Sequence, residues 1–176
     1  MSKTMVTPRN EEITLSDGEI IVSKTDLKGE IKYVNDTFCR VAEMSVDEII
    51  NQPHSIIRHP DMPRSIFHYL WRQIASKKEI FAYVKNMSKS GKFYWVFAHV
   101  TPTLDRNGEI TGYHSSRRKA DPDKISAISD MYRKLLEIEN RPQNRKEGLE
   151  AAVCYLEEFF KSNNTSYDEF IWSVGK

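Results

Sequence analysis

The chain has 176 residues, a length that suits one compact domain with an appendage or two very small domains. Its 26 Lys and Arg residues nearly balance its 25 Asp and Glu residues. The resulting net charge of +1 argues against a nucleic-acid-binding protein, which normally carries a basic excess. Hydrophobic residues make up 39% of the chain and aromatic residues 11%, so it can bury a core and wholesale disorder is excluded.

The first elements in chain order are two short strands that form a hairpin. Residues 19–25 and 30–34 are rich in β-branched residues, and a turn at Asp26–Gly29 can join them. Directly after the hairpin, Asn35 or Asp36 can cap a short helix, because their side-chain oxygens accept hydrogen bonds from free helical N–H groups. The start of the chain therefore predicts a β-hairpin followed by a capped helix.

Two further helices are expected before the next strand. Ser45 and Glu48 have the spacing of a capping box, which predicts a second short helix. A longer amphipathic helix is expected after Pro63, where apolar residues recur at helical spacing. Its apolar positions are Ile66, Phe67, Leu70, Trp71 and Ile74.

Three strands follow, at residues 80–87, 93–104 and 109–118. The Asn-Gly step within Asp105–Gly108 is a strong signal for a hairpin between the last two strands. Two strands, a helical insert and a three-stranded meander predict an α+β fold. In this fold a five-stranded antiparallel sheet carries helices on one face and is followed by a C-terminal helical extension.

A boundary is expected at about residue 121, where Asp121 suits an N-cap and Pro122 the first helical position. Before this boundary the chain carries 18 basic and 14 acidic residues, and after it 8 basic and 11 acidic residues. The net charge of +1 is therefore a cancellation between two unlike parts. The expected organisation is an N-terminal arm, a compact α+β domain and a helical extension at residues 1–18, 19–120 and 121–176.

The extension is expected to be helical throughout. Apolar residues repeat every three or four positions at 125–136, and a second helix is expected at about 146–161. A last helical turn is expected at 167–174. Two interpretations remain open: a helical hairpin that packs its own apolar faces together, or a surface that docks a partner.

Several kinds of chemistry lack support in the sequence. Cys39 and Cys154 lie far apart and form no redox-type or metal-type pair, and the spacing of His54 and His59 fits no helical zinc motif. There is no Gly-rich phosphate loop and no nucleophile–base constellation, so an enzyme is not expected. No apolar run approaches the length of about 18–20 residues that spans a bilayer, and the N-terminus has no apolar signal core. These features predict a cytoplasmic protein with no metal site and no direct membrane insertion.

A family resemblance rests on a series of motifs in a fixed order. They are Asn35-Asp36-Thr37-Phe38, Pro53-His54, Arg58-His59-Pro60-Asp61-Met62-Pro63, Trp71, Val84-Lys85-Asn86 and Gly91-Lys92-Phe93-Tyr94-Trp95-Val96. The series resembles the PAS domain of bacterial aerotaxis and energy-taxis receptors over about residues 20–120. The hexapeptide that begins at Arg58 is its most specific part.

The resemblance implies a PAS fold whose pocket binds FAD non-covalently and reports redox or energy state to chemotaxis signalling. Since the chain has no membrane span, the resemblance further implies the stand-alone soluble sensor of a bipartite energy-taxis system. Its partner would be a membrane-bound chemotaxis receptor, which can recruit it to the inner face of the membrane. The sequence leaves open whether the chain forms a homodimer.

Six residues are the candidate cofactor contacts, and each has a structural alternative. The Asn86 amide can donate to and accept from the edge of a flavin ring, or it is an ordinary strand amide. Asn35 can serve likewise or cap its helix. Arg58 can pair with a phosphate or hold Asp61, and Asp61 in turn can orient His59 or cap the helix after Pro63.

The last two candidates are His59 and Trp71. His59 can respond to a change in flavin charge, because histidine titrates near neutral pH, or it is a satisfied loop residue. Trp71 is a cofactor contact or part of the core.

One departure from the family pattern concerns the start of the strand at 80–87. FAD-binding relatives show Pro-Trp-x-Gly where this chain has Ile80 and Ala82 at the Trp and Gly positions. Phe81 cannot replace the Trp, since adjacent strand residues point to opposite faces.

Two alternatives to FAD remain. One is a haem-binding gas or redox sensor with His59, His68 or His99 as axial ligand. The other is a cofactor-free PAS module that binds other proteins.

Overall fold

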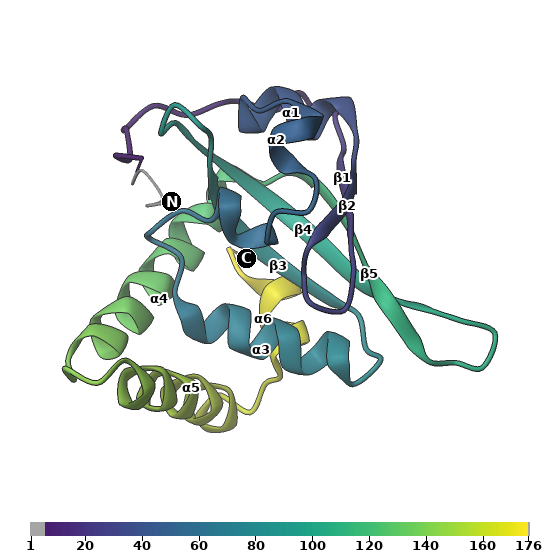
Figure 1. The fold of residues 1–176 in the computed structure, drawn as a ribbon. Coiled ribbons are helices and arrows are strands. Elements are labelled where there is room, and N and C mark those ends of the chain that lie inside the picture. Colours follow the sequence, from purple (N-terminus) through teal and green to yellow (C-terminus); the bar gives the residue numbers. More distant parts are fainter. Residues whose placement is uncertain (1–5, 176) are drawn as a thin grey trace.

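The computed structural model describes residues 6–175, and a five-stranded antiparallel sheet lies at its centre (Figure 1). The order of the strands across the sheet is β2-β1-β5-β4-β3. The strands are β1 (Ile21–Thr25), β2 (Ile31–Val34), β3 (Ile80–Met87), β4 (Phe93–Leu104) and β5 (Ile110–Lys119). This confirms the α+β fold and the five-stranded sheet that the sequence predicts.

The turns of two hairpins each contain an aspartate that is followed three residues later by a glycine. The Asp26 carboxylate accepts hydrogen bonds from the backbone N–H of Lys28 at 2.9 Å and of Glu30 at 3.0 Å. Asp105 makes the same pair of bonds in the β4–β5 turn. Gly29 and Gly108 have φ values of 79° and 80°, a region that glycine enters without steric cost.

The helices between β2 and β3 are α1 (Asp36–Ala42), α2 (Val46–Ile49), the 3₁₀ helix η1 (His54–Ile57) and α3 (Arg64–Ala75). The Asn35 side chain accepts a hydrogen bond from Phe38 N and caps α1. The predicted capping box of Ser45 and Glu48 is present in α2. The residue before α3 is Pro63, whose side chain makes no capping hydrogen bond.

The two faces of the sheet carry different partners because strand side chains alternate. Val84 and Asn86 of β3 point toward the inner face, which η1 and α3 cover. Phe81 points to the outer face, where its ring lies 4.9 Å from that of Trp172. The expectation that Phe81 faces away from the pocket side is therefore confirmed.

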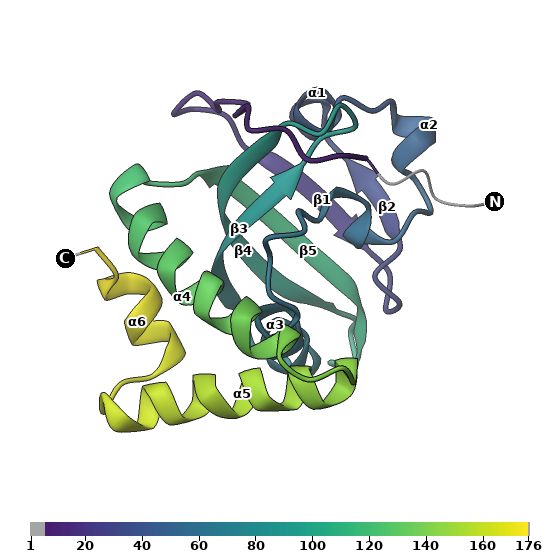
Figure 2. The same ribbon diagram turned by 90° about the vertical axis from the view of Figure 1, so that its left-hand side faces the viewer.

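The C-terminal helices are α4 (Pro122–Asn140), α5 (Arg145–Ser162) and α6 (Tyr167–Ser173), and Asp121 caps α4 with Pro122 in its first turn. Helices α4 and α6 pack on β3 and β4 at the outer face, and α4 and α5 contact α3 (Figure 2). The hydroxyl of Tyr132 in α4 donates to the carbonyl oxygen of Tyr83 in β3 at 2.7 Å. The extension therefore packs both on itself and on the sheet. No helix within residues 6–175 is long and apolar enough to cross a membrane.

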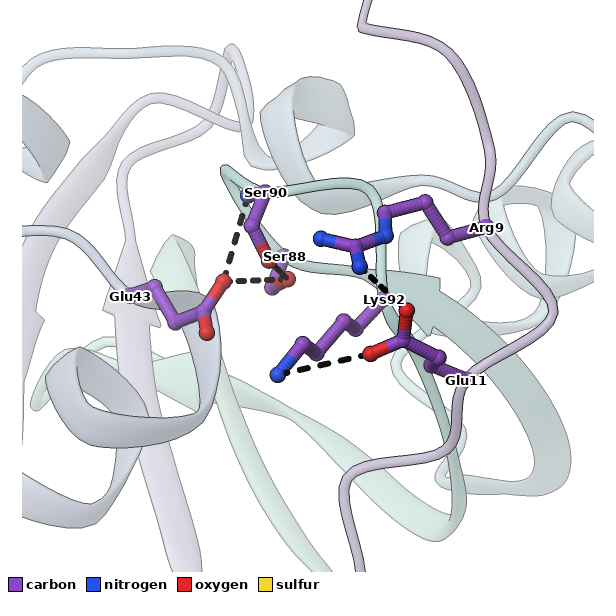
Figure 3. Close-up of polar contacts among 6 residues, drawn as sticks. All are labelled: Arg9, Glu11, Glu43, Ser88, Ser90 and Lys92. Atoms are coloured by element: carbon purple, nitrogen blue, oxygen red, sulfur yellow. Dashed lines mark hydrogen bonds and ion pairs between the residues drawn. The ribbon is translucent and has the colours of Figure 1, made fainter.

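The N-terminal arm runs along the turn between β3 and β4 (Figure 3). Glu11 makes ion pairs with Arg9 and with Lys92, the latter at 3.6 Å. On the other side of the turn, Glu43 accepts hydrogen bonds from the Ser88 hydroxyl at 2.7 Å and from Ser90 N at 3.1 Å. The turn is thus held from both sides, by the arm and by the end of α1.

Candidate functional site

A cavity of about 220 Å³ lies between the inner face of the sheet and the helices η1 and α3. Its walls combine apolar side chains with a small group of nitrogen donors, which is the usual composition of a small-molecule site. The strands and the β1–β2 turn contribute Ser23, Thr25, Lys28, Gly29, Val84, Asn86, Ala98, Val100, Tyr113, His114, Ser115 and Arg117. The helical side contributes Pro53, His54, Ser55, Arg58, Phe67, Leu70, Trp71 and Ile74.

Arg117 brings a buried positive charge to the cavity. Its residue is 2% exposed, and its Nε donates to the Ser115 hydroxyl at 2.9 Å. Its Nη2 donates to the hydroxyl of Ser23 and to Nε2 of His54, while its Nη1 has no partner among residues 6–175. Burial lowers the pKa of Arg117 to about 10, so the guanidinium stays charged at neutral pH. These protein partners are all neutral, so they leave its charge uncompensated.

His54 is neutral in this environment. Burial, together with the charges of Arg117 and Arg58, lowers the pKa of His54 to about 3. Its Nε2 accepts from Arg117 at 2.8 Å, which assigns the ring proton to Nδ1. The buried part of the cavity therefore presents cationic and neutral groups.

The low pKa of His54 predicts acid sensitivity. Since the unfolded chain binds this proton near pH 6.5 and the folded chain only near pH 3, stability is retained above pH 6.5 and lost as the pH falls below it. Between pH 7 and pH 5 this one group is expected to remove about 2 kcal/mol of the free energy of unfolding. Urea denaturation of wild type and His54→Gln at both pH values measures the difference. An equal loss of stability in both proteins would contradict the assignment.

Arg58 and Asn86 meet at the end of the cavity nearest to the β3 edge. A backbone bridge joins the two residues, and the Arg58 guanidinium lies 3.8 Å from the centre of the Phe67 ring. Burial lowers the pKa of Arg58. Arg58 Nε and Asn86 Nδ2 are buried and have no hydrogen-bond partner within the described residues.

Three lining residues thus carry an unpartnered N–H donor: Arg58, Asn86 and Arg117. A buried donor without an acceptor costs about 1–3 kcal/mol, and more when it is charged. Native proteins leave few such groups. The arrangement therefore fits a ligand that presents acceptor atoms to this wall.

Trp71 stands at the boundary between the cavity and solvent, with 36% of its surface exposed. Its ring meets that of Tyr113 edge to face at 5.3 Å. A Cβ atom added at Gly29 would lie 3.1 Å from the Trp71 ring, so the β1–β2 turn closes tightly over it. Trp71 is thus part of the cavity wall on the side of this turn.

His59 and Asp61 do not line the cavity. His59 is 3% exposed, and its Nδ1 accepts from Asp61 N at 3.0 Å. The Asp61 carboxylate pairs with Lys85 Nζ at 2.6 Å. Burial, followed by the Lys85 charge, lowers the pKa of His59. This cluster fastens the segment between η1 and α3 to strand β3.

Asn35 also lies outside the cavity. Its Oδ1 accepts from the backbone of Val22 at 3.0 Å and of Phe38 at 3.2 Å. Its Nδ2 donates to Ile20 O at 2.8 Å. The side chain is therefore fully used in joining β1 to α1.

The histidines considered for haem also lie away from the cavity lining. His68 is exposed on α3, and His99 stacks on Phe81 at 4.2 Å on the outer face of the sheet. The two histidines that do line the cavity are His54 and His114. Within the described residues no group of three His, Cys, Asp or Glu side chains could hold a metal ion.

His54 and Arg117 line the cavity but are not among the six site residues predicted from the sequence. A signal for Arg117 exists in strand 110–119, where alternation places Tyr113, Ser115 and Arg117 on one face. An arginine in line with a buried tyrosine is unusual, because an arginine is rarely buried without a partner. The contact between His54 and Arg117 joins residues 63 positions apart and has no local signal.

Most of the residues that line this cavity lie in a segment that matches a known protein family. Residues 31–117 match the model of a family described as PAS fold. Through these residues the chain belongs to the PAS family. The matched residues include β2, the helices from α1 to α3, β3 and β4, and they end within β5; most of the cavity-lining residues lie among them.

Two relatives have sequences that are similar to part of this chain. The aerotaxis receptor of Escherichia coli (strain K12) is 38% identical over 121 residues, which are 69% of this chain and 24% of the receptor. The nitrogen fixation regulatory protein of Klebsiella pneumoniae is 26% identical over 104 residues, 59% of this chain and 21% of that protein. The chain thus spans less than a quarter of the length of either relative.

Solved structures confirm the fold of the PAS domain. A light-oxygen-voltage domain studied with a flavin analogue matches with a TM-score of 0.56 and 14% identity, covering 63% of this chain and 83% of that one. The light state of the Aureochrome1 LOV domain matches with a TM-score of 0.54 and 18% identity, covering 70% and 94%.

Proposed function

We propose that the PAS cavity binds the ring of FAD non-covalently and that the chain is a redox sensor in signal transduction. The observation that carries the proposal is the set of unpartnered donors on Arg58, Asn86 and Arg117 beside apolar walls. The polar edge of a flavin ring presents carbonyl oxygens and ring nitrogens that can accept from these donors. Bound FAD would supply a group whose electron density changes on reduction.

The lining residues suit such a ring in three respects. Leu70, Ile74 and Val100 offer apolar contacts to its faces. Arg58 and Arg117 offer positive charge to its electron-rich edge, and His54 stays neutral beside them. The cavity volume of about 220 Å³ is below the range of about 300–1,000 Å³ that is usual for ligand pockets. It suits a ring system, while the remainder of FAD would extend outside.

The comparisons support this choice of cofactor and of signalling system. One relative is an aerotaxis receptor, and one structural neighbour is a LOV domain studied with a flavin analogue. On this basis we infer that the chain relays redox or energy state to a membrane-bound chemotaxis receptor. The relay would begin at the cavity and end in a changed contact with that partner.

The proposal predicts which substitutions weaken FAD binding. Asn86→Ala and Arg58→Ala each remove one donor to the ligand, and each is expected to raise the Kd for FAD about tenfold. Titration of ligand-free protein followed by flavin fluorescence measures this. Arg106→Ala and Asn107→Ala, in the exposed β4–β5 turn, are matched controls and should leave Kd unchanged. An unchanged Kd in both cavity variants would contradict the assigned contacts.

A further inference from the structure

Helix α3 lies beside helices α4 and α5 of the C-terminal extension (Figures 1 and 2). Phe67, Leu70, Trp71 and Ile74 on one side of α3 line the cavity. On another side, the Tyr69 ring packs at 4.7 Å on that of Tyr167, which begins α6. The same helix therefore contacts both the candidate ligand site and the extension.

The first turn of α3 is capped by a residue far away in the sequence. A helix N-terminus leaves free N–H groups and favours a negative charge. Since Pro63 makes no capping bond, the carboxylate of Glu139 near the end of α4 takes this place. It accepts from Ser65 N at 2.8 Å, from Arg64 N at 3.1 Å and from Arg64 Nε at 3.2 Å.

Glu139 is also a point at which the extension is tightly packed. Its side chain is 2% exposed, so its charge is satisfied by α3 rather than by water. A Cβ atom added at Gly148 of α5 would lie 2.1 Å from Glu139 O, so α4 and α5 are in close backbone contact there. Arg64 Nη1 donates to Arg145 O at 2.9 Å. Helices α3, α4 and α5 thus meet around Glu139 and its partner Arg64.

The capped turn lies between two cavity-lining residues, Arg58 before α3 and Phe67 in its first half. A ligand that fixes these two residues also fixes the N–H groups that Glu139 binds. Conversely, an extension that is docked through Glu139 fixes the turn for the ligand. The two events share one structural element, which is the physical requirement for coupling between sites.

We propose that Glu139 is a positioning residue that couples occupation of the cavity to docking of the helical extension. The direction of coupling is positive, since both events order the first turn of α3. The ligand is the flavin of the proposed function, on which this inference rests. Because coupling is reciprocal, loss of the Glu139 contact must weaken flavin binding although Glu139 does not line the cavity.

The test compares Glu139→Gln with Glu157→Gln in the full chain. Glu157 forms an exposed ion pair with Arg72 at 2.9 Å, so it too joins the extension to α3 but caps nothing. Two readouts are needed: the Kd for FAD and the amide hydrogen exchange of Arg64–Phe67 and of α5. In Glu139→Gln we expect Kd to rise at least fivefold and exchange to increase in both segments together. In Glu157→Gln neither readout should change.

The outcomes separate this inference from the proposed function. If wild type binds FAD and Glu139→Gln binds it equally well, the coupling is overturned and the flavin site stands. If wild type binds no FAD, the proposed function fails, and exchange in the ligand-free proteins decides whether Glu139 couples the two segments. Increased exchange in α5 with an unchanged first turn of α3 would overturn the role of Glu139.

A second variant covers the case in which Glu139→Gln does not fold. Arg64→Gln removes the guanidinium contacts and keeps both backbone bonds of the cap. A rise in Kd of about twofold to fivefold is expected, with a joint increase in exchange. Unchanged values of both would overturn the proposal.

Discussion

Arg117→Met is expected to make the ligand-free protein more stable by about 1–4 kcal/mol and to weaken FAD binding at least tenfold. The guanidinium is buried, its charge has no acidic partner among its hydrogen-bond contacts, and Nη1 lacks an acceptor in the described part of the chain. Replacing such a charge by an apolar side chain of similar length removes a desolvation penalty. Ser23 and His54 would still satisfy each other, since their side chains lie 3.1 Å apart.

Urea denaturation of the ligand-free proteins and FAD titration measure the two effects. Arg118→Met is the matched control, because the neighbouring Arg118 is exposed and lies over the Phe97 ring at 5.4 Å on the outer face. The control should leave the Kd for FAD unchanged. Its free energy of unfolding should stay within about 0.5 kcal/mol of wild type. If Arg117→Met were less stable and still bound FAD normally, Arg117 would be a structural residue rather than a ligand contact.

Ala98→Phe is expected to abolish FAD binding while the fold persists. Ala98 is 1% exposed and lies on β4 in the cavity wall, so an added ring would occupy the cavity of about 220 Å³. Since the new side chain fills existing space, the free energy of unfolding should stay within about 1.5 kcal/mol of wild type. Binding should fall more than a hundredfold, because ring and ligand would require the same volume.

Ala82→Phe is the control for this substitution. Ala82 is the cross-strand partner of Ala98 and equally buried, but it does not line the cavity. Overpacking at Ala82 is expected to lower the free energy of unfolding by about 1–3 kcal/mol. If both variants were destabilised alike, the ring at position 98 would not be filling existing space. If Ala98→Phe still bound FAD, the cavity would not be the flavin site. A cofactor-free interaction module would then be the better description of the chain.

The features of the fold that could be predicted from sequence are those with local causes. The turn at Asp105–Gly108 and the caps at Asn35 and Asp121 depend on a side chain and a backbone group a few residues apart. Local patterns of this kind are visible in a sequence. The strand and helix positions followed from hydrophobic periodicity for the same reason.

The candidate site could be predicted only in part from local sequence patterns. Of the six candidates, the structure brings Arg58, Trp71 and Asn86 to the cavity. Asn35, His59 and Asp61 instead use their polar atoms in contacts that hold α1 and the segment before α3 in place.

The remaining features arise from contacts over long sequence distances. Arg117 meets His54 across 63 positions, and Glu139 meets Ser65 across 74. Periodicity indicates which side of an element is buried, but it does not indicate the element that covers it. The placement of the extension on the outer face and on α3 was therefore not predictable from the sequence.

The absorbance spectrum of the purified protein, before and after incubation with FAD and removal of free ligand, tests the central claim most directly. We predict the near-ultraviolet and blue bands of a bound flavin, and their loss in Ala98→Phe prepared in the same way. A wild-type protein that is folded and stays colourless after incubation with FAD would contradict the account. A Soret band would contradict it in favour of haem.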